Sequence, residues 1–178
     1  MSTTKRSGLA PVLTLATLVA ATLFPAPAEA ATAAEAFERF KALEGDWVAA
    51  EDGPMTKKGE LVSSFRVTAA GSAVVETEFP GTDHEMVTIY YREGDTLVLD
   101  HYCMEGNQPR MRAREFAGAK VHFTFDGGGN IADPKKDRHM HSAWIELVGP
   151  HEIRSEWTEI AEGEPVLVVP VHLVRAGS

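Results

Sequence analysis

Cysteine is almost absent from this chain, in which Cys103 is the only one among 178 residues. A single cysteine cannot form an internal disulfide, so the core must be held together by packing alone. The simplest expectation for Cys103 is a buried, inert thiol. A metal ligand or a reactive thiol is the alternative.

An excess of positive charge is also lacking. The 17 lysines and arginines are outnumbered by 26 aspartates and glutamates, which gives a net charge of −9 at pH 7. This balance argues against nucleic acids and anionic membrane surfaces as partners. It does not identify a partner or an oligomeric state.

Long hydrophobic runs are absent except near the N-terminus. An uncharged apolar run over 9–24 follows Lys5 and Arg6 and precedes the cleavage signal Ala28-Glu29-Ala30. The run is short for a membrane span, which needs about 20 residues. We therefore expect a cleaved signal peptide over residues 1–30 rather than an uncleaved anchor. The protein is then exported, to the periplasm or the extracellular space, with no membrane span after cleavage.

Helical periodicity is confined to residues 31–44. Phe37, Phe40 and Leu43 recur at three-residue spacing and give a single apolar stripe. Gly45 ends the pattern. The sequence therefore predicts one short N-terminal helix ahead of a second region of different character.

That second region, residues 45–178, contains short strand-like stretches separated by glycine, proline and aspartate turn signals. Because no helices intervene, we expect an all-β domain, an antiparallel up-and-down barrel of about ten strands. An open sandwich is the alternative. We place the strands at 46–51, 60–69, 72–79, 84–92, 95–103, 110–117, 119–126, 138–147, 151–160 and 165–175.

Several catalytic signatures are missing. The sequence has no Gly-x-Ser-x-Gly motif, and the glycines of 127–129 lack the Lys and Ser/Thr of a phosphate loop. We expect residues 126–137 to form a long connection, either plain or a flap over the barrel mouth. The spacing of His139, His141 and Glu146 matches a cupin metal site, but on one continuous strand Glu146 faces away from both histidines.

Histidine is present at alternating positions of the predicted strands. His101 and Cys103 share one strand face, and His139 and His141 share another, because strand side chains alternate. Asp100 faces the opposite side from His101 and cannot form a relay with it. In an antiparallel barrel, His101 near its strand's end and His139 near its strand's start lie at the same barrel end.

We therefore expect one histidine-lined mouth that binds a small polar or amphipathic molecule. A binding protein is favoured over an enzyme, and no catalytic residue is assigned. Apolar residues pack the lumen, among them Leu97, Leu99, Met111, Phe123 and Phe125. The predicted ligand-binding residues are His84, His101, Cys103, Arg110, Arg112, His139 and His141.

Two other functions stay open. His101, His139 and His141 form a zinc-like set, which would support a metal-dependent hydrolase or isomerase with Asp83 or Glu85 as the acid–base group. Alternatively, the barrel is filled with side chains and has a structural or interaction role.

The residues Gly45-Asp46-Trp47, just after the short helix, resemble the Gly-x-Trp of calycin barrels: lipocalins, fatty-acid-binding proteins and nitrobindin-like proteins. Arg175 is similar in placement to the basic residue that packs across that tryptophan in lipocalins. The resemblance implies that Trp47 and Arg175 are a structural cation–π pair. Residues 71–81, 101–103 and 106–112 also resemble uncharacterised exported bacterial proteins of this broad group.

Nitrobindin-like members of the group hold haem through a histidine near the C-terminal end. His172 is the candidate that the resemblance implies here. The other features of that haem pocket are not evident in the sequence, so haem is not expected.

Overall fold

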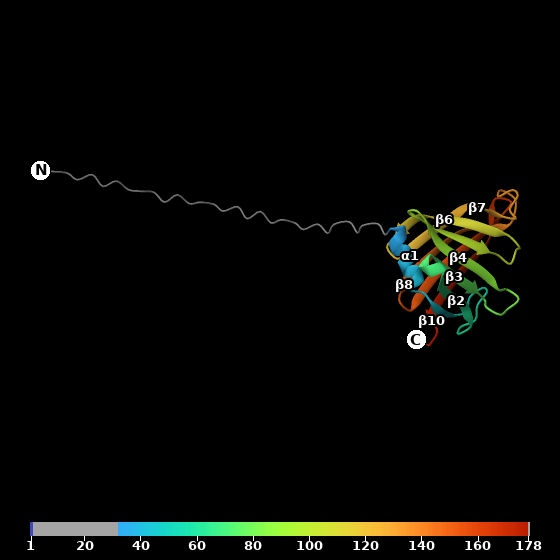
Figure 1. Ribbon diagram of the computed structural model, residues 1–178, viewed down its shortest axis with the longest axis horizontal. Coiled ribbons are helices and arrows are strands. Elements are labelled where there is room, and N and C mark those ends of the chain that lie inside the picture. Colours follow the sequence, from blue (N-terminus) through green and yellow to red (C-terminus); the bar gives the residue numbers. More distant parts are fainter. Residues whose placement is uncertain (2–31, 178) are drawn as a thin grey trace.

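The computed structural model describes Met1 and residues 32–177 and shows a closed antiparallel barrel with a short α-helix (Figure 1). The all-β barrel predicted from the sequence is confirmed. The predicted signal peptide lies outside the described residues except for Met1. No helix in the described part of the chain is long and apolar enough to cross a membrane.

The strands pair with their neighbours in chain order, and the last strand closes the barrel by pairing with the first. Every predicted strand boundary lies within three residues of the observed one. The strands are β1 (Gly45–Ala49), β2 (Leu61–Thr68), β3 (Ala73–Glu78), β4 (Met86–Glu93), β5 (Thr96–Tyr102), β6 (Gln108–Ala117), β7 (Lys120–Gly129), β8 (His139–Gly149), β9 (Glu152–Ala161) and β10 (Glu164–Arg175).

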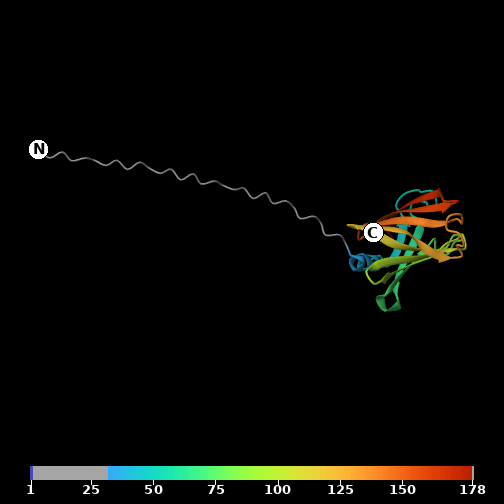
Figure 2. The ribbon, with the colours of Figure 1, turned by 90° about the horizontal axis from the view of Figure 1, so that it is seen from above.

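The helix, α1 (Ala33–Lys41), begins at a capping box. The Thr32 hydroxyl accepts a hydrogen bond from the Glu35 backbone N–H, and the Glu35 carboxylate accepts one from the Thr32 backbone N–H. The predicted apolar stripe faces the barrel, where Phe40 is fully buried against Tyr90 with ring centroids 4.6 Å apart. α1 therefore covers one end of the barrel, here called the helix end (Figure 2).

Trp47 and Arg175 form the expected pair at the helix end. They are register partners on β1 and β10, and the guanidinium carbon lies 4.5 Å from the indole centroid. Trp47 Nε1–H donates to the Leu43 carbonyl at 2.8 Å, and Arg175 donates to the carbonyls of Ala42 and Glu44 at 2.8 Å each. These bonds satisfy carbonyls just beyond the helix and fasten it to the barrel.

Strand β7 is longer than predicted. It continues through 127–129, which the sequence assigned to a loop. Gly128 pairs with Pro109, and a Cβ at Gly128 would lie 2.4 Å from the Gln108 carbonyl oxygen. Glycine allows this close backbone approach. The connection to β8 is therefore 130–138.

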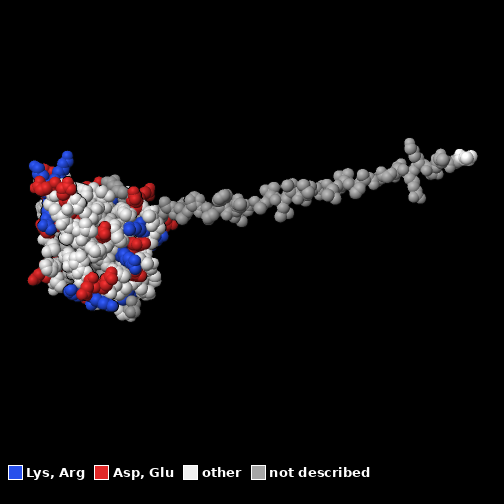
Figure 3. Space-filling model, turned by 180° about the vertical axis from the view of Figure 1, so that it is seen from behind, with Lys and Arg blue, Asp and Glu red and all other residues white. Residues whose placement is uncertain are grey.

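The barrel interior holds the apolar residues expected there. Leu97, Leu99, Met111 and Phe123 are at most 1% exposed, while Phe125 is partly exposed. The outer surface carries both signs of charge, which Figure 3 shows interspersed on the visible face.

Candidate functional site

Two carboxylates on β3 point into the barrel. Glu76 and Glu78 are buried, as is Val74 on the same face of the strand, while Val75 and Thr77 are only half-buried. Glu78 is the last residue of β3, so it lies toward the end of the barrel away from α1, here called the far end. Buried carboxylates need partners, and neighbouring strands supply them.

A hydrogen-bonded chain links Glu78 to His101 through Thr88. Thr88 Oγ1 lies 2.5 Å from Glu78 Oε1 and 2.8 Å from His101 Nδ1. An ionised carboxylate only accepts, so the single hydroxyl proton goes to Glu78. His101 Nδ1 therefore carries a proton and donates it to Thr88. The chain runs from imidazole N–H through hydroxyl to carboxylate.

Glu76 has two donors of its own. Ser63 Oγ donates to Glu76 Oε1 at 2.6 Å, and Tyr90 Oη donates to Glu76 Oε2 at 2.7 Å. Burial raises the pKa of Glu76 to about 8, assisted by the nearby Glu78 and opposed by the two hydrogen bonds. Burial also raises the pKa of Tyr90 well above its usual value.

His101 is 3% exposed, and burial alone would lower its pKa. Cys103 and Glu78 outweigh that effect and raise the pKa of His101 to about 10. Glu78 Oε1 lies 3.6 Å from His101 Nδ1. The charged imidazolium is therefore the favoured form near neutral pH, and it faces the rings of the barrel wall, with the Trp157 centroid 5.3 Å away.

Two atoms of this cluster have no hydrogen-bond partner. Glu78 Oε2 and His101 Nε2 are buried and unpaired, and both residues line the cavity in the lumen. The Cys103 side chain interacts with His101 and raises its pKa, but Nε2 of His101 is buried without a hydrogen-bond partner. The two residues thus share one cavity wall, and each keeps one polar atom buried and unpaired behind its surface.

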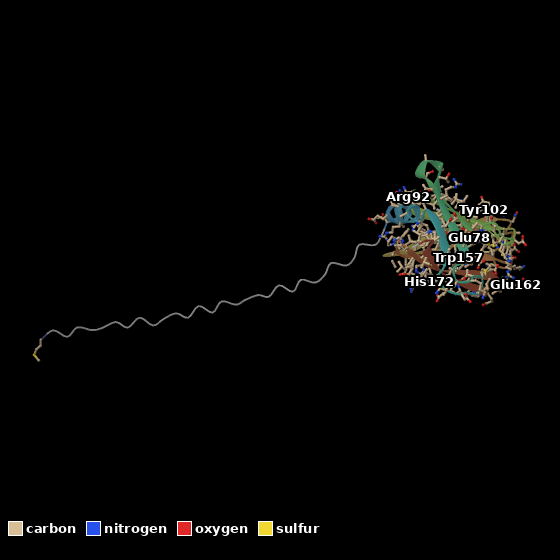
Figure 4. All side chains as sticks on the ribbon, turned by 90° about the horizontal axis from the view of Figure 1, so that it is seen from below. Glu78, Arg92, Tyr102, Trp157, Glu162 and His172 are labelled. Carbon is tan, nitrogen blue, oxygen red and sulfur yellow. The ribbon has the colours of Figure 1, made fainter. Side chains whose placement is uncertain are left out.

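The cavity has a volume of about 70 Å³, enough for several water molecules or a small organic group. Its wall is largely apolar: Phe40, Phe65, Phe79 and Trp157 contribute rings, and Met55, Met86 and Met140 contribute flexible thioethers. Figure 4 shows Glu78 and Trp157 near the middle of the barrel domain and Glu162 toward its edge. An apolar space with a few convergent polar groups is typical of small-molecule sites.

Phe79 reaches this wall from a left-handed backbone conformation. Its φ is +50°, and its side chain is buried and lines the cavity. This conformation costs a bulky residue about 1–2 kcal/mol. A hydrogen bond of 2.7 Å from the Phe79 N–H to the Val62 carbonyl helps to hold it.

Of the residues predicted from the sequence, His101 is the one that lines the cavity. His84 is exposed in the turn before β4, because that strand begins at Met86 and not at His84. Cys103 follows β5 and is partly exposed.

Arg110 and Arg112 lie on the outer face, because Met111 between them points inward. Arg110 forms ion pairs with Asp100 and Glu93, and Arg112 pairs with Glu93 and Asp126. The arginines therefore do not join His101 at the cavity. Asp100 faces outward as predicted.

His139 and His141 form a separate pair. His139 Nδ1 lies 2.7 Å from the Asp137 carbonyl, and His139 Nε2 lies 3.2 Å from His141 Nδ1. A carbonyl only accepts, so His139 is protonated at Nδ1 and a neutral His139 accepts at Nε2 from His141. Phe125 packs against both rings. Burial lowers the pKa of His141, with a further contribution from His139.

The register shifts between Met140 and Ser142, within the segment that carries this pair, and His139 is fully buried. Met140 lines the cavity, whereas the two histidines do not. Within residues 32–177, no group of three or more His, Cys, Asp or Glu is arranged to hold a metal ion. The predicted set of His101, His139 and His141 is thus not assembled.

His172 lies on β10 between Val171 and Leu173, which contribute to the cavity wall. Its two ring nitrogens contact Glu51 and Glu152 at 3.2 and 3.1 Å. Both nitrogens are occupied outside the lumen, so His172 does not offer a haem ligand to the cavity.

Sequence reasoning missed both carboxylates of the site, together with Ser63, Thr88 and Tyr90 as their partners. The available signal was two glutamates at alternate positions of a strand, next to Val74 on the same face. Comparison with protein-family models and with curated proteins finds no match to this chain. The assignment of the site therefore depends on its geometry.

Proposed function

We propose that this protein binds a small amphipathic molecule inside the barrel. The apolar body of the ligand packs against the aromatic and methionine side chains of the cavity wall. Its polar group meets Glu78 and His101. The ligand site is therefore deeper than the mouth inferred from the sequence, and His101 is common to both.

The observation that carries this proposal is the pair of unpaired buried atoms, Glu78 Oε2 and His101 Nε2, beside an apolar cavity. A buried polar atom without a partner costs about 1–3 kcal/mol, and more when it is charged. A ligand that supplies both partners recovers that free energy, so the site favours a group with one donor and one acceptor. A hydroxyl or an amide meets this requirement.

The cavity also favours a binding role over a purely structural barrel. A barrel filled with side chains has no need of glutamates in its lumen, because apolar residues of similar size pack there at lower cost. Here Glu76 and Glu78 occupy inward positions beside open space.

The cellular setting that we propose is outside the cytoplasm, in the periplasm or the extracellular medium. The apolar run over 9–24 and the sequence Ala28-Glu29-Ala30 support export. The calycin-like grouping is likewise proposed: the closed ten-strand barrel and the observed stacking of Arg175 on Trp47 support it.

Native mass spectrometry of the exported protein tests the binding proposal. We expect a retained small molecule as a discrete added mass. Ser155→Leu fills the cavity from β9 and should remove that mass, whereas Ser142→Leu, on the outer face of β8, should keep it. Equal retention by both variants would place the ligand elsewhere.

A further inference from the structure

We propose that the Glu78–Thr88–His101 chain also catalyses proton transfer within its ligand, converting a small β,γ-unsaturated ketone into the conjugated isomer. This inference rests on the proposed function, because it requires the ketone to occupy the lumen cavity. Three features carry it: a carboxylate oxygen left free to act as a base, an imidazole nitrogen left free to act as a donor, and a dry wall around both.

Glu78 is suited to be the base. Its Oε1 is held by the Thr88 hydroxyl at 2.5 Å, which fixes the carboxylate and leaves Oε2 directed to no protein partner. Glu76 cannot take this part, because Ser63 and Tyr90 occupy both of its oxygens.

His101 is suited to bind the ketone oxygen. Its Nδ1 donates to Thr88, so in the imidazolium form Nε2–H remains as a donor. The charged form gains from the Glu78 carboxylate oxygen 3.6 Å from Nδ1. A preorganised donor aimed at a developing negative charge stabilises an enolate more than a ketone, which is the condition for catalysis.

The reaction balances without any co-reactant. Glu78 Oε2 takes a proton from the carbon between the carbonyl and the alkene, and the electrons of that C–H bond form the dienolate. His101 Nε2–H donates a hydrogen bond to the dienolate oxygen. The protonated Glu78 then returns its proton to the distal alkene carbon, the double bond moves into conjugation, and the carboxylate is restored.

The aromatic lining suits a ring-shaped ketone, but the cavity of about 70 Å³ is smaller than such a ring. The flexible side chains of Met55, Met86 and Met140 must therefore move apart to admit the substrate. Phe79, Trp157 and Met86 shield the site from water, and an enolate in a dry site is protected from competing proton exchange. The substrate class is therefore a small cyclic β,γ-enone.

The test uses the purified exported protein and 3-cyclohexen-1-one, and conversion to 2-cyclohexen-1-one is followed by the ultraviolet absorption of the conjugated product. We expect conversion above the buffer rate. Glu78→Gln should lower kcat by at least about 100-fold, as expected for loss of a general base. Glu146→Gln, a matched change on the outer face of β8, should leave the rate unchanged.

His101→Gln should also lower kcat by at least about 100-fold, because an amide donor carries no charge. Binding of 2-cyclohexen-1-one to each variant, followed by perturbation of the methionine methyl NMR signals, separates folding and binding from chemistry. A wild-type protein that binds the enone without accelerating conversion would overturn the catalytic inference and leave the binding proposal standing. Absence of binding would overturn both, and full activity in Glu78→Gln would overturn the role of that carboxylate.

Discussion

The two ends of the barrel treat their polar groups differently. At the helix end, Trp47 Nε1–H and the Arg175 guanidinium are paired with backbone carbonyls near the end of α1. Toward the far end, Glu78 Oε2, His101 Nε2 and Asn107 Oδ1 are buried without partners. The helix end therefore contributes stability. The far end keeps unpaired polar atoms at a cost in stability, which accords with the binding site that we propose there.

The largest expected effect is the dependence of stability on pH through Glu76. Its pKa is raised from 4.5 to about 8 in the folded state, so above pH 4.5 the unfolded chain ionises first. The free energy of unfolding should therefore fall as pH rises from 4.5 to 8. The full shift sets an upper bound of about 5 kcal/mol on this contribution.

Urea unfolding across that pH range measures the effect. In the Glu76→Gln variant the free energy of unfolding should change little over this pH range. In the Glu146→Gln variant it should fall as in the wild type. His101 should cause a second fall in the free energy of unfolding, between pH 6.5 and about 10. Its pKa is raised from 6.5 to about 10 in the folded state, so the stabilising charge is lost as pH rises through that range. Identical pH profiles for the wild type and Glu76→Gln would contradict the account of the far end.

At the helix end, Trp47→Ala should lower the free energy of unfolding by about 4 kcal/mol. The indole is fully buried, bonded to Leu43 and covered by Arg175. Trp144 on the outer face is the matched control, since it is only partly buried beneath Lys120. Trp144→Ala should lower the free energy of unfolding clearly less in the same urea titration. Equal losses in the two variants would contradict a particular contribution of the helix end to stability.

Thr88→Val should lower the free energy of unfolding by about 2 kcal/mol. The change keeps the shape of the side chain but deprives Glu78 Oε1 and His101 Nδ1 of their shared hydroxyl. Thr77→Val, on the outward face of β3, is the control. If the two variants unfold at the same urea concentration, the hydrogen-bonded chain contributes nothing.

The smallest expected effect is on the outer face. Arg110→Gln breaks the ion pair with Asp100, in which the two side chains are 40% and 23% exposed. Water and salt screen such pairs, so we expect a loss below about 1 kcal/mol, decreasing further in high salt. A loss above about 2 kcal/mol would show that the outer arginines matter more than the lumen network.

Much of the fold could be predicted because its signals are local. Strand lengths follow from turn residues, and the Trp47–Arg175 pair is implied by the resemblance to calycin barrels. Two features of β7 and β8 could not be predicted from the sequence, because they depend on a neighbouring strand. Gly128 extends β7 by passing close to Gln108, and the register of β8 against β9 shifts between Met140 and Ser142, which breaks the simple alternation of faces.

The buried positions of Glu76 and Glu78 were not predicted from the sequence, for a different reason. On β3 the alternation of apolar residues favours the face of Ala73 and Val75 as the buried one, and this would place Glu76 and Glu78 outside. In the structure Glu76 and Glu78 face inward instead. Hydroxyl groups of Ser63, Thr88 and Tyr90 on adjacent strands donate hydrogen bonds to them and offset the cost of burial. Such compensation between strands cannot be read from one strand alone, and functional sites commonly break local patterns in this way.

The most direct test of the central claim is NMR of methionine methyl groups during titration with 2-cyclohexen-1-one. Met55, Met86 and Met140 line the cavity, Met111 is buried without lining it, and Met104 is exposed. The account predicts that the signals of the three cavity methionines shift together while those of Met104 and Met111 stay in place. Shifts confined to Met104, or no shifts at saturating enone, would contradict a ligand site in the lumen.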